Sequence, residues 1–316
     1  MISRRDTPPV SETIRRHTLA LAVTNRCPLR CDFCCVPPGP GDLERELVLD
    51  LIDQTEEIGT FRSIGFTGGE PLIRRKLVLE AGARARSKGL RWGLTTGMGW
   101  ARDSEHATKV AAELAESGLT NITVSVDASH LDQRDARPVE RFISACDSAH
   151  AQVTVSCTSN APIPQLPIKV PPSALVEFHY VSPTGYATGW DNSHRRQLNL
   201  QKSHCPMRDG LTLSVWPDGS VYPCCSTYVV NKERALIVGN VKNDSLTTIL
   251  QRALSDPYLA AIREVGFAGV IVLAPEAVPW SDYDIPHKLD PCHLCSAVAG
   301  QPEALSAIRS AITGPS

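Results

Sequence analysis

Cys27, Cys31 and Cys34 form a C-x3-C-x2-C run directly after an apolar stretch of the chain. Three thiolates on one short loop can bind three irons of a cubane cluster and leave the fourth iron without a protein ligand. Four protein ligands would instead make a closed electron carrier or a structural site. A zinc site is the alternative, but no further pair of ligands is evident in this half of the chain. The spacing therefore indicates an iron–sulfur site that takes part in a reaction.

A second group of cysteines lies far downstream and could form another site: Cys205, Cys224, Cys292 and Cys295. Two cysteines near a predicted hairpin and two from a C-x2-C turn would make a four-thiolate cage, which can hold either zinc or an iron–sulfur cluster. Cys225 follows a predicted ligand and is not needed for that cage.

The chain contains eleven cysteines, and its N-terminus is charged and lacks the apolar segment of an export signal. We therefore expect a cytoplasmic protein whose cysteines bind metal rather than form disulfides. Cys146 and Cys157 stand alone in apolar surroundings and are predicted to be inert core thiols. Cys35 neighbours a predicted ligand, so its side chain must point elsewhere, and we interpret it as a packed thiol.

The bulk composition is that of an ordinary globular protein. Its 316 residues are 42% hydrophobic and 21% charged, with a formal net charge of −2. The absence of a basic excess argues against a nucleic-acid partner. No apolar run approaches the roughly 20 residues that a membrane-spanning helix needs.

The elements that must position the first cysteines are short strands alternating with amphipathic helices. The predicted strands are 18–24, 63–67, 91–95, 121–127, 152–158 and 176–181, and the predicted helices are 47–58, 73–88, 105–117 and 139–150. This alternation is typical of parallel βα units. Six such strands predict an α/β fold, a partial (β/α)6 barrel that is smaller than the full eight-stranded form.

The second half of the chain has a different pattern. Proline and glycine become frequent after residue 160, and the polar segment to about residue 200 is interpreted as a connector. A hairpin is predicted from 211–215 and 220–222 around a Pro-Asp-Gly turn, followed by a helix at 245–254 and a loop-rich stretch leading to Cys292. We therefore expect an extension at 1–16, a barrel at 17–195 and a small domain at 196–316.

Residues suited to ligand binding follow the predicted strands, at the edge where parallel barrels gather their chemistry. Those after the second, third and fourth strands are Gly68, Gly69, Glu70, Thr96, Ser125 and Asp127. The two glycines allow close backbone approach to a ligand, and the Glu70 carboxylate suits an ammonium group. The polar groups after the fourth strand suit ribose hydroxyls or a carboxylate.

The cysteine spacing, together with Gly-Gly-Glu-Pro after the second strand, resembles the radical S-adenosylmethionine enzymes over residues 17 to about 190. The resemblance implies a [4Fe–4S] cluster on Cys27, Cys31 and Cys34, with S-adenosylmethionine chelating the unique iron. In such enzymes one electron, from a donor such as flavodoxin or ferredoxin, cleaves the sulfonium. The resulting 5′-deoxyadenosyl radical takes a hydrogen atom from the substrate.

The same resemblance assigns binding roles to individual residues. Gly68, Gly69 and Glu70 match the family's methionine-binding motif, whereas Thr96, Ser125 and Asp127 correspond only by strand position. Phe33, just before the last cysteine of the run, matches the family's aromatic residue that packs against the adenine.

Residues 216–225, with the Val-Gly-Asn-Val stretch after them, resemble the C-terminal extensions of the SPASM and twitch type. This resemblance implies one auxiliary [4Fe–4S] cluster on Cys205, Cys224, Cys292 and Cys295. No cysteine follows Cys295, so we expect a twitch-like truncated domain without a second auxiliary cluster. Cys225 is a possible hydrogen-atom donor to a substrate radical, and a packing role is the alternative.

The product of the reaction depends on whether the substrate radical loses an electron or gains a hydrogen atom. A substrate radical that loses an electron gives oxidation or a crosslink, and one that receives a hydrogen atom from a thiol gives epimerisation. Enzymes of similar architecture mostly modify ribosomally made peptides, and a smaller group oxidises aminocyclitols or sugars. We expect peptide modification, with dehydrogenation of a small-molecule alcohol as the alternative. A non-catalytic iron–sulfur sensor is the alternative from another class.

Overall fold

The computed structural model describes residues 16–36, 41–161, 165–190, 199–200, 204–226, 234–283 and 290–313. The predicted N-terminal extension falls outside these ranges except for Arg16. The predicted boundary between residues 195 and 196 also falls outside them, and it stays a prediction.

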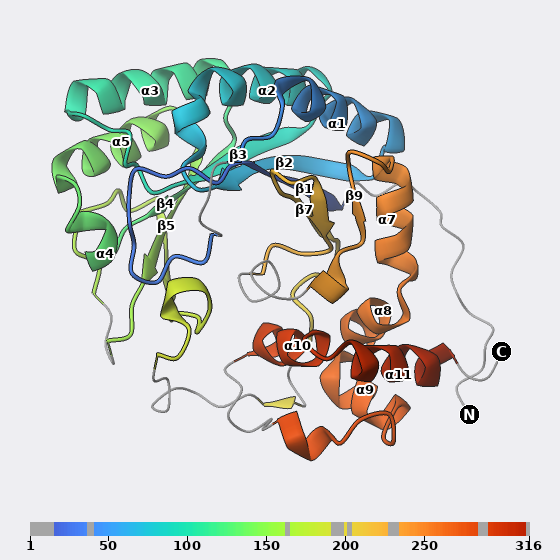
Figure 1. Cartoon of the computed structure of the whole chain (residues 1–316). Coiled ribbons are helices and arrows are strands. Elements are labelled where there is room, and N and C mark those ends of the chain that lie inside the picture. The colour runs from blue at the N-terminus through green and yellow to red at the C-terminus, as the bar shows by residue number, and fades with distance from the viewer. Residues whose placement is uncertain are drawn as a thin grey trace.

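Six parallel strands, paired in chain order, form the larger part of one sheet. They are β1 (His17–Thr24), β2 (Phe61–Gly68), β3 (Arg91–Thr96), β4 (Asn121–Ser125), β5 (Gln152–Thr158) and β6 (Leu175–His179). All six predicted strands are confirmed, with shifts of no more than a few residues at their ends. The sheet is curved and open, with β6 at one edge, as expected for a partial barrel (Figure 1).

The helices between these strands cover one face of the sheet (Figure 1). They are α1 (Arg45–Ile58), α2 (Arg75–Ser87), α3 (Ser104–Glu116) and α5 (Ala136–Ser148), with the short α4 (Ala128–Leu131) and the 3-10 helix η1 (Pro71–Arg74) beside them. Their ends follow local chemistry. Asp103 accepts the N–H of His106 at the start of α3, and Gly59 takes a left-handed conformation at the end of α1. These helices leave the carboxyl ends of the strands uncovered.

The predicted hairpin is confirmed and extends the same sheet. Strand β7 (Thr212–Val215) pairs in parallel with β1, and β8 (Ser220–Tyr222) and β9 (Gly239–Asn240) follow in antiparallel order. At the start of this junction, Nδ1 of His17 accepts a hydrogen bond from the N–H of Leu211 at 3.1 Å. The two halves of the chain therefore share one nine-stranded sheet.

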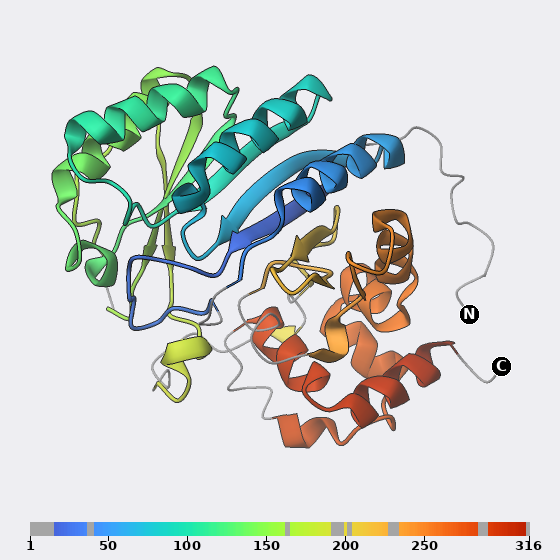
Figure 2. The same ribbon diagram turned by 45° about the horizontal axis from the view of Figure 1, so that its top comes forward.

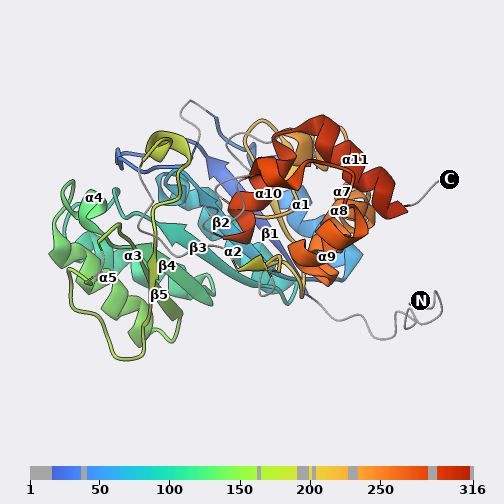
Figure 3. The ribbon, with the colours of Figure 1, turned by 90° about the horizontal axis from the view of Figure 1, so that it is seen from below.

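The chain has two hydrophobic cores, and the boundary between them lies after α7, later in the chain than the predicted connector. Helix α7 (Leu246–Ser255) packs with the hairpin into the core of the sheet. A second core is built from α8 (Pro257–Glu264), α9 (Gly266–Leu273), α10 (Pro291–Ala299) and α11 (Pro302–Thr313). These helices lie together beyond β7, on the side of the sheet away from α2 and α3 (Figures 2 and 3).

The prediction of a loop-rich stretch before Cys292 is wrong, because α8 and α9 occupy much of it. Both helices have only eight residues, and the run from Gly266 to Leu273 is apolar on every side, so it shows no helical periodicity. The predicted C-x2-C turn is likewise the beginning of α10. No helix in the described ranges combines the length and apolar character needed to cross a membrane.

Candidate active site

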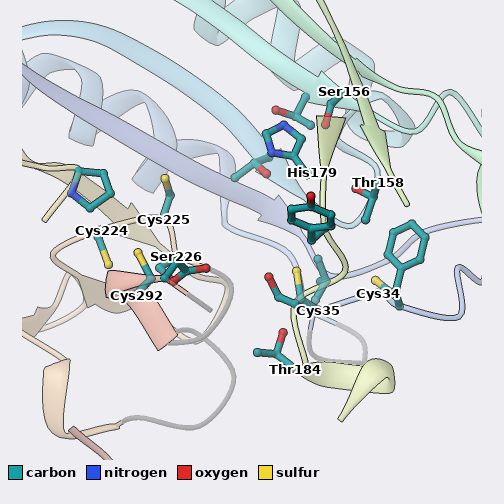
Figure 4. A pocket seen from close by; sticks show the side chains of 18 of the residues that line it. Cys34, Cys35, Ser156, Thr158, His179, Thr184, Cys224, Cys225, Ser226 and Cys292 are labelled. Atoms are coloured by element: carbon teal, nitrogen blue, oxygen red, sulfur yellow. The ribbon is translucent and has the colours of Figure 1, made fainter. Parts of the chain in front are cut away.

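A cavity of about 910 Å³ lies between the carboxyl ends of the parallel strands and the C-terminal helices. The predicted ligand cysteines of both groups line it, and so do Cys35 and Cys225. Figure 4 shows Cys34 and Cys35 on one side, and Cys224, Cys225 and Cys292 on the other. The fold therefore brings the two predicted metal sites to one cavity.

The loop that carries the first group packs directly against the Gly-Gly-Glu turn after β2. The N–H groups of Gly69 and Glu70 donate to the carbonyls of Thr24 and Arg26, at 2.7 and 2.9 Å. A Cβ on Gly69 would lie 2.3 Å from the Arg26 oxygen, and one on Gly68 would lie 2.2 Å from that of Thr24. Both glycines line the cavity, but the close approach that requires them here is to the cysteine loop itself.

The segment after β4 holds the middle of the loop. The N–H of Arg30 donates to Oε1 of Gln133 at 2.7 Å, and the N–H of Asp32 donates to Oγ of Ser129 at 3.2 Å. The Ser129 hydroxyl also hydrogen-bonds the Cys31 thiol. Ser129 and Gln133 are not among the site residues predicted from the sequence. The sequence offers only one sign of them, which is that both are polar and lie within ten residues of the end of a predicted strand.

The far end of the loop is covered by the 3-10 helix η2 (Gly185–Ala187). The N–H of Tyr186 donates to the Cys34 carbonyl at 3.1 Å. Gly185 has φ +57°, and a Cβ there would lie 2.2 Å from the same carbonyl oxygen. The buried hydroxyl of Thr184 lacks a hydrogen-bond partner within the described residues and lines the cavity near Cys35 (Figure 4).

The three thiols of the loop fit the group predicted for them. Burial raises the pKa of Cys27 to about 11 and that of Cys31 to about 12, and the neighbouring Cys34 contributes to both shifts. Cluster binding must therefore displace protons from these thiols. No three His, Cys, Asp or Glu side chains in the described ranges converge on a position for a single ion.

Glu70 lies behind the cavity wall, and its side chain has no exposed surface. Its carboxylate accepts from the Thr96 hydroxyl at 2.9 Å and from the Leu72 N–H at 3.1 Å. Burial raises its pKa to about 7. Thr96 is also buried, and neither side chain lines the cavity. Ligand binding by these two residues stays a prediction, while the structure shows them joining the ends of β2 and β3.

The residues after β4 present an imidazole to the cavity. Asp127 is only 2% exposed, and its Oδ1 lies 2.8 Å from Nδ1 of His130. His130 lines the cavity, and its ring centroid is 6.0 Å from that of Phe33, the predicted adenine contact. Ser125 lines the cavity as well. Asp127 was predicted from the sequence, whereas His130, the side chain that Asp127 orients, was not.

The second group of thiols is assembled from three segments. Cys205 precedes β7, Cys224 follows β8, and Cys292 and Cys295 lie at the start of α10. Burial raises the pKa of Cys292 to about 12, and the nearby Asp290 and Cys205 contribute. Burial likewise raises the pKa of Cys224, with contributions from Cys295 and Cys292. All four thiols line the same cavity.

Two further side chains belong to this second group. Tyr258 of α8 is fully buried, and its hydroxyl, which makes no regular hydrogen bond, approaches the thiol of Cys295. Cys225 is exposed, and its sulfur points away from those of Cys224 and Cys292 (Figure 4).

The isolated cysteines lie away from the cavity. Cys146 and Cys157 are both buried in the core of the sheet region, as predicted from their apolar surroundings.

Comparison with known proteins identifies two regions. Residues 21–164 match the model of the radical SAM superfamily, and residues 205–265 match that of the SPASM iron–sulfur cluster-binding domain. The putative peptide biosynthesis protein YydG of Bacillus subtilis (strain 168) is 21% identical, over 92% of this chain and 94% of its own length. The GTP 3′,8-cyclase of Paenarthrobacter nicotinovorans is 34% identical, but the match spans 43% of this chain and 40% of the cyclase.

Solved structures share the fold. The complex of BtrN with AdoMet and 2-DOIA has a TM-score of 0.52 at 17% identity, covering 78% of this chain and 87% of BtrN. The protein anSMEcpe with bound AdoMet also has a TM-score of 0.52, at 14% identity over 79% of this chain and 84% of that protein.

Proposed function

This chain is a member of the radical SAM superfamily with a SPASM iron–sulfur domain, and from that premise we propose that it epimerises a residue of a peptide. The observation that carries the proposal is the shared cavity, which has the three-cysteine loop on one side and the exposed Cys225 on the other. The likeness to YydG over nearly the whole of both chains supports a peptide as the substrate class.

The loop cysteines Cys27, Cys31 and Cys34 would hold the [4Fe–4S] cluster, and Phe33 and His130 would flank the nucleoside of S-adenosylmethionine. When bound, these cofactors supply a 5′-deoxyadenosyl radical that removes one hydrogen atom from a carbon of the substrate.

Cys225 would complete the reaction from the opposite wall. Its S–H bond breaks as a C–H bond forms on the other face of the substrate carbon, so the substrate gains as many hydrogens as it lost. The sulfur is left as a thiyl radical, and one electron from the reducing protein and one proton from water restore the thiol. Because Cys225 points away from the neighbouring ligands, its hydrogen is free for transfer.

The test uses the reconstituted, reduced enzyme with S-adenosylmethionine and candidate peptides in deuterated water. We expect one deuterium at an α-carbon, a gain of about one mass unit, because the thiol proton exchanges with solvent. Cys225→Ala should still form 5′-deoxyadenosine but should stop deuterium incorporation. Cys35→Ala, which changes a thiol on the other wall, should leave both measurements unaltered.

Other outcomes would replace the proposal. A peptide that loses about two mass units would indicate oxidation or crosslinking, and turnover only with a small alcohol would indicate dehydrogenation. If the reduced protein forms no 5′-deoxyadenosine at all, the remaining hypothesis is that it is a non-catalytic iron–sulfur sensor.

A further inference from the structure

The outer edge of β6 has no partner strand within the described ranges. Strand β6 is the last strand at one side of the nine-stranded sheet, and only β5 pairs with it there. The carbonyl of His179 faces β5, because it accepts the N–H of Ser159 at 2.8 Å. Backbone groups alternate in direction along a strand, so those of Val176 and Phe178 point outward. This edge therefore presents two N–H and two C=O groups, in pairs about 6.6 Å apart.

The same segment carries a concentration of exposed apolar side chains. Phe178 and Tyr180 are 45% and 57% exposed, and Leu175, at the beginning of β6, is 49% exposed. Tyr186 in η2 is exposed as well. Of the nine large apolar side chains that are exposed in the described ranges, five lie between residues 175 and 190. Apolar side chains that gather on one part of a surface in this way indicate a binding site.

The outer edge of β6 leads into the large cavity. Phe178, His179 and Tyr180 all line the cavity, and Thr158, the partner of His179 in the β5–β6 register, lines it from β5. Figure 4 shows Thr158 and His179 at the cavity. An extended chain laid along this edge would continue the sheet and turn every second side chain toward the cavity.

We propose that the peptide substrate binds as an added strand on the outer edge of β6, with apolar side chains of its own against Phe178 and Tyr180. The inference rests on the proposed function, which supplies a peptide as the substrate class. Paired N–H and C=O groups at a two-residue spacing match the backbone of another extended chain. The exposed apolar side chains of the strand favour β-branched or aromatic residues next to the residue that is modified.

The first experiment uses the peptide that takes up deuterium in the assay above, labelled with fluorescein at one end. Fluorescence anisotropy measures its binding to the holoenzyme, with both clusters and S-adenosylmethionine present. Versions with a single N-methyl group, placed in turn at successive residues beside the modified one, each lack one N–H. We expect the dissociation constant to rise about fivefold at every second position and to change little at the positions between. Equal effects at successive positions, or no effect at any, would overturn the strand pairing.

The second experiment changes the enzyme. Phe178→Pro removes an outward N–H of β6, and the hydrogen bonds to β5 stay in place because that N–H does not face β5. Phe178→Ala is the matched control, since it removes the ring but keeps the N–H. The proline variant should bind the labelled peptide about fivefold more weakly than the alanine variant. Val272→Ala, which changes an exposed apolar residue of α9 outside the cavity, should bind it like the unaltered enzyme.

Two results of the second experiment would contradict the proposal. Equal binding by the proline and alanine variants would show that the edge donates no hydrogen bond to the peptide. A change from dimer to monomer in the proline variant, measured by light scattering, would show that the edge pairs with a second copy of this chain instead.

Measurements on the unaltered enzyme separate this inference from the proposed function. If dithionite-reduced enzyme forms no 5′-deoxyadenosine, or if no candidate peptide takes up deuterium, the proposed function is overturned. If a peptide takes up deuterium but its N-methylated versions show no alternation in binding, only the added strand is overturned.

Discussion

The two groups of cysteines face one cavity but reach it in different ways. Cys27, Cys31 and Cys34 belong to one loop, whose backbone is held by hydrogen bonds with three neighbouring segments. The second group comes from segments separated by up to 90 positions (295 − 205) and depends on the helical core to bring them together. The cysteines of the first site are therefore neighbours in the sequence, whereas those of the second are brought together only by tertiary packing.

The largest effect is expected when all three cysteines of the first group are removed. The variant with Cys27, Cys31 and Cys34 all changed to alanine should lose all cofactor cleavage, and iron should fall from about eight to about four atoms per chain. Because the second group has its own support, the auxiliary cluster should keep its spectrum. Loss of both clusters would show that the two sites do not assemble independently.

A smaller change tests how the loop is held. Gly185→Ala places a methyl group against the Cys34 carbonyl, and the left-handed backbone adds strain, a local cost of about 1–3 kcal/mol. We expect weaker loading of the first cluster, measured by titrating iron against the electron paramagnetic resonance signal. Gly189→Ala is the matched control, because Gly189 has φ +87° but nothing within 4 Å of its added Cβ. Equal effects of the two changes would mean that backbone strain alone is responsible.

The junction between the two regions should respond to acid. Burial lowers the pKa of His17 to about 4, and the cations Arg16 and Arg263 contribute. A lowered histidine pKa means that stability is fully present above about pH 6.5 and is lost as the pH falls through 4. The full loss is about 3 kcal/mol. Urea unfolding of the metal-free protein between pH 7 and pH 4 should show this decline, and His17→Gln should flatten it. An unchanged slope in that variant would assign the decline to other groups.

The smallest effect is expected on the reduction potential of the auxiliary cluster, which the second group of cysteines would bind. Tyr258→Phe removes a hydroxyl beside Cys295 and keeps the ring that fills the core. A donor near a ligating thiolate raises the reduction potential, so its loss should lower the auxiliary potential on the order of tens of millivolts. Spectroelectrochemistry measures the reduction potentials of both clusters in one sample, and the potential of the first cluster serves as the internal reference. A shift of both potentials would contradict a local effect of Tyr258.

The same contrast explains what could be predicted from the sequence. The first loop and the six strands follow from short-range spacing and alternation, which a single sequence displays directly. The loop's supports do not, because Ser129 and Gly185 lie roughly 100 and 150 positions from the cysteines they hold. Tyr258 was missed for the same reason, since its partner Cys295 lies in another helix. Helix α9 was missed because its residues are apolar on every side, so the segment shows no helical periodicity.

The pairing of β1 with β7 links the first cysteine loop to the hairpin that carries Cys224. Strand β1 leads into the first cysteine loop, and β7 leads through a turn and β8 to Cys224, so the register Thr18–Thr212 to Leu21–Val215 fixes where Cys224 lies relative to that loop. A slip of one residue would shift Cys224 by about 3.3 Å and turn the side chains of β7 to the opposite face. Through this strand pair, the position of Cys224 relative to the first loop can therefore change only in whole-residue steps.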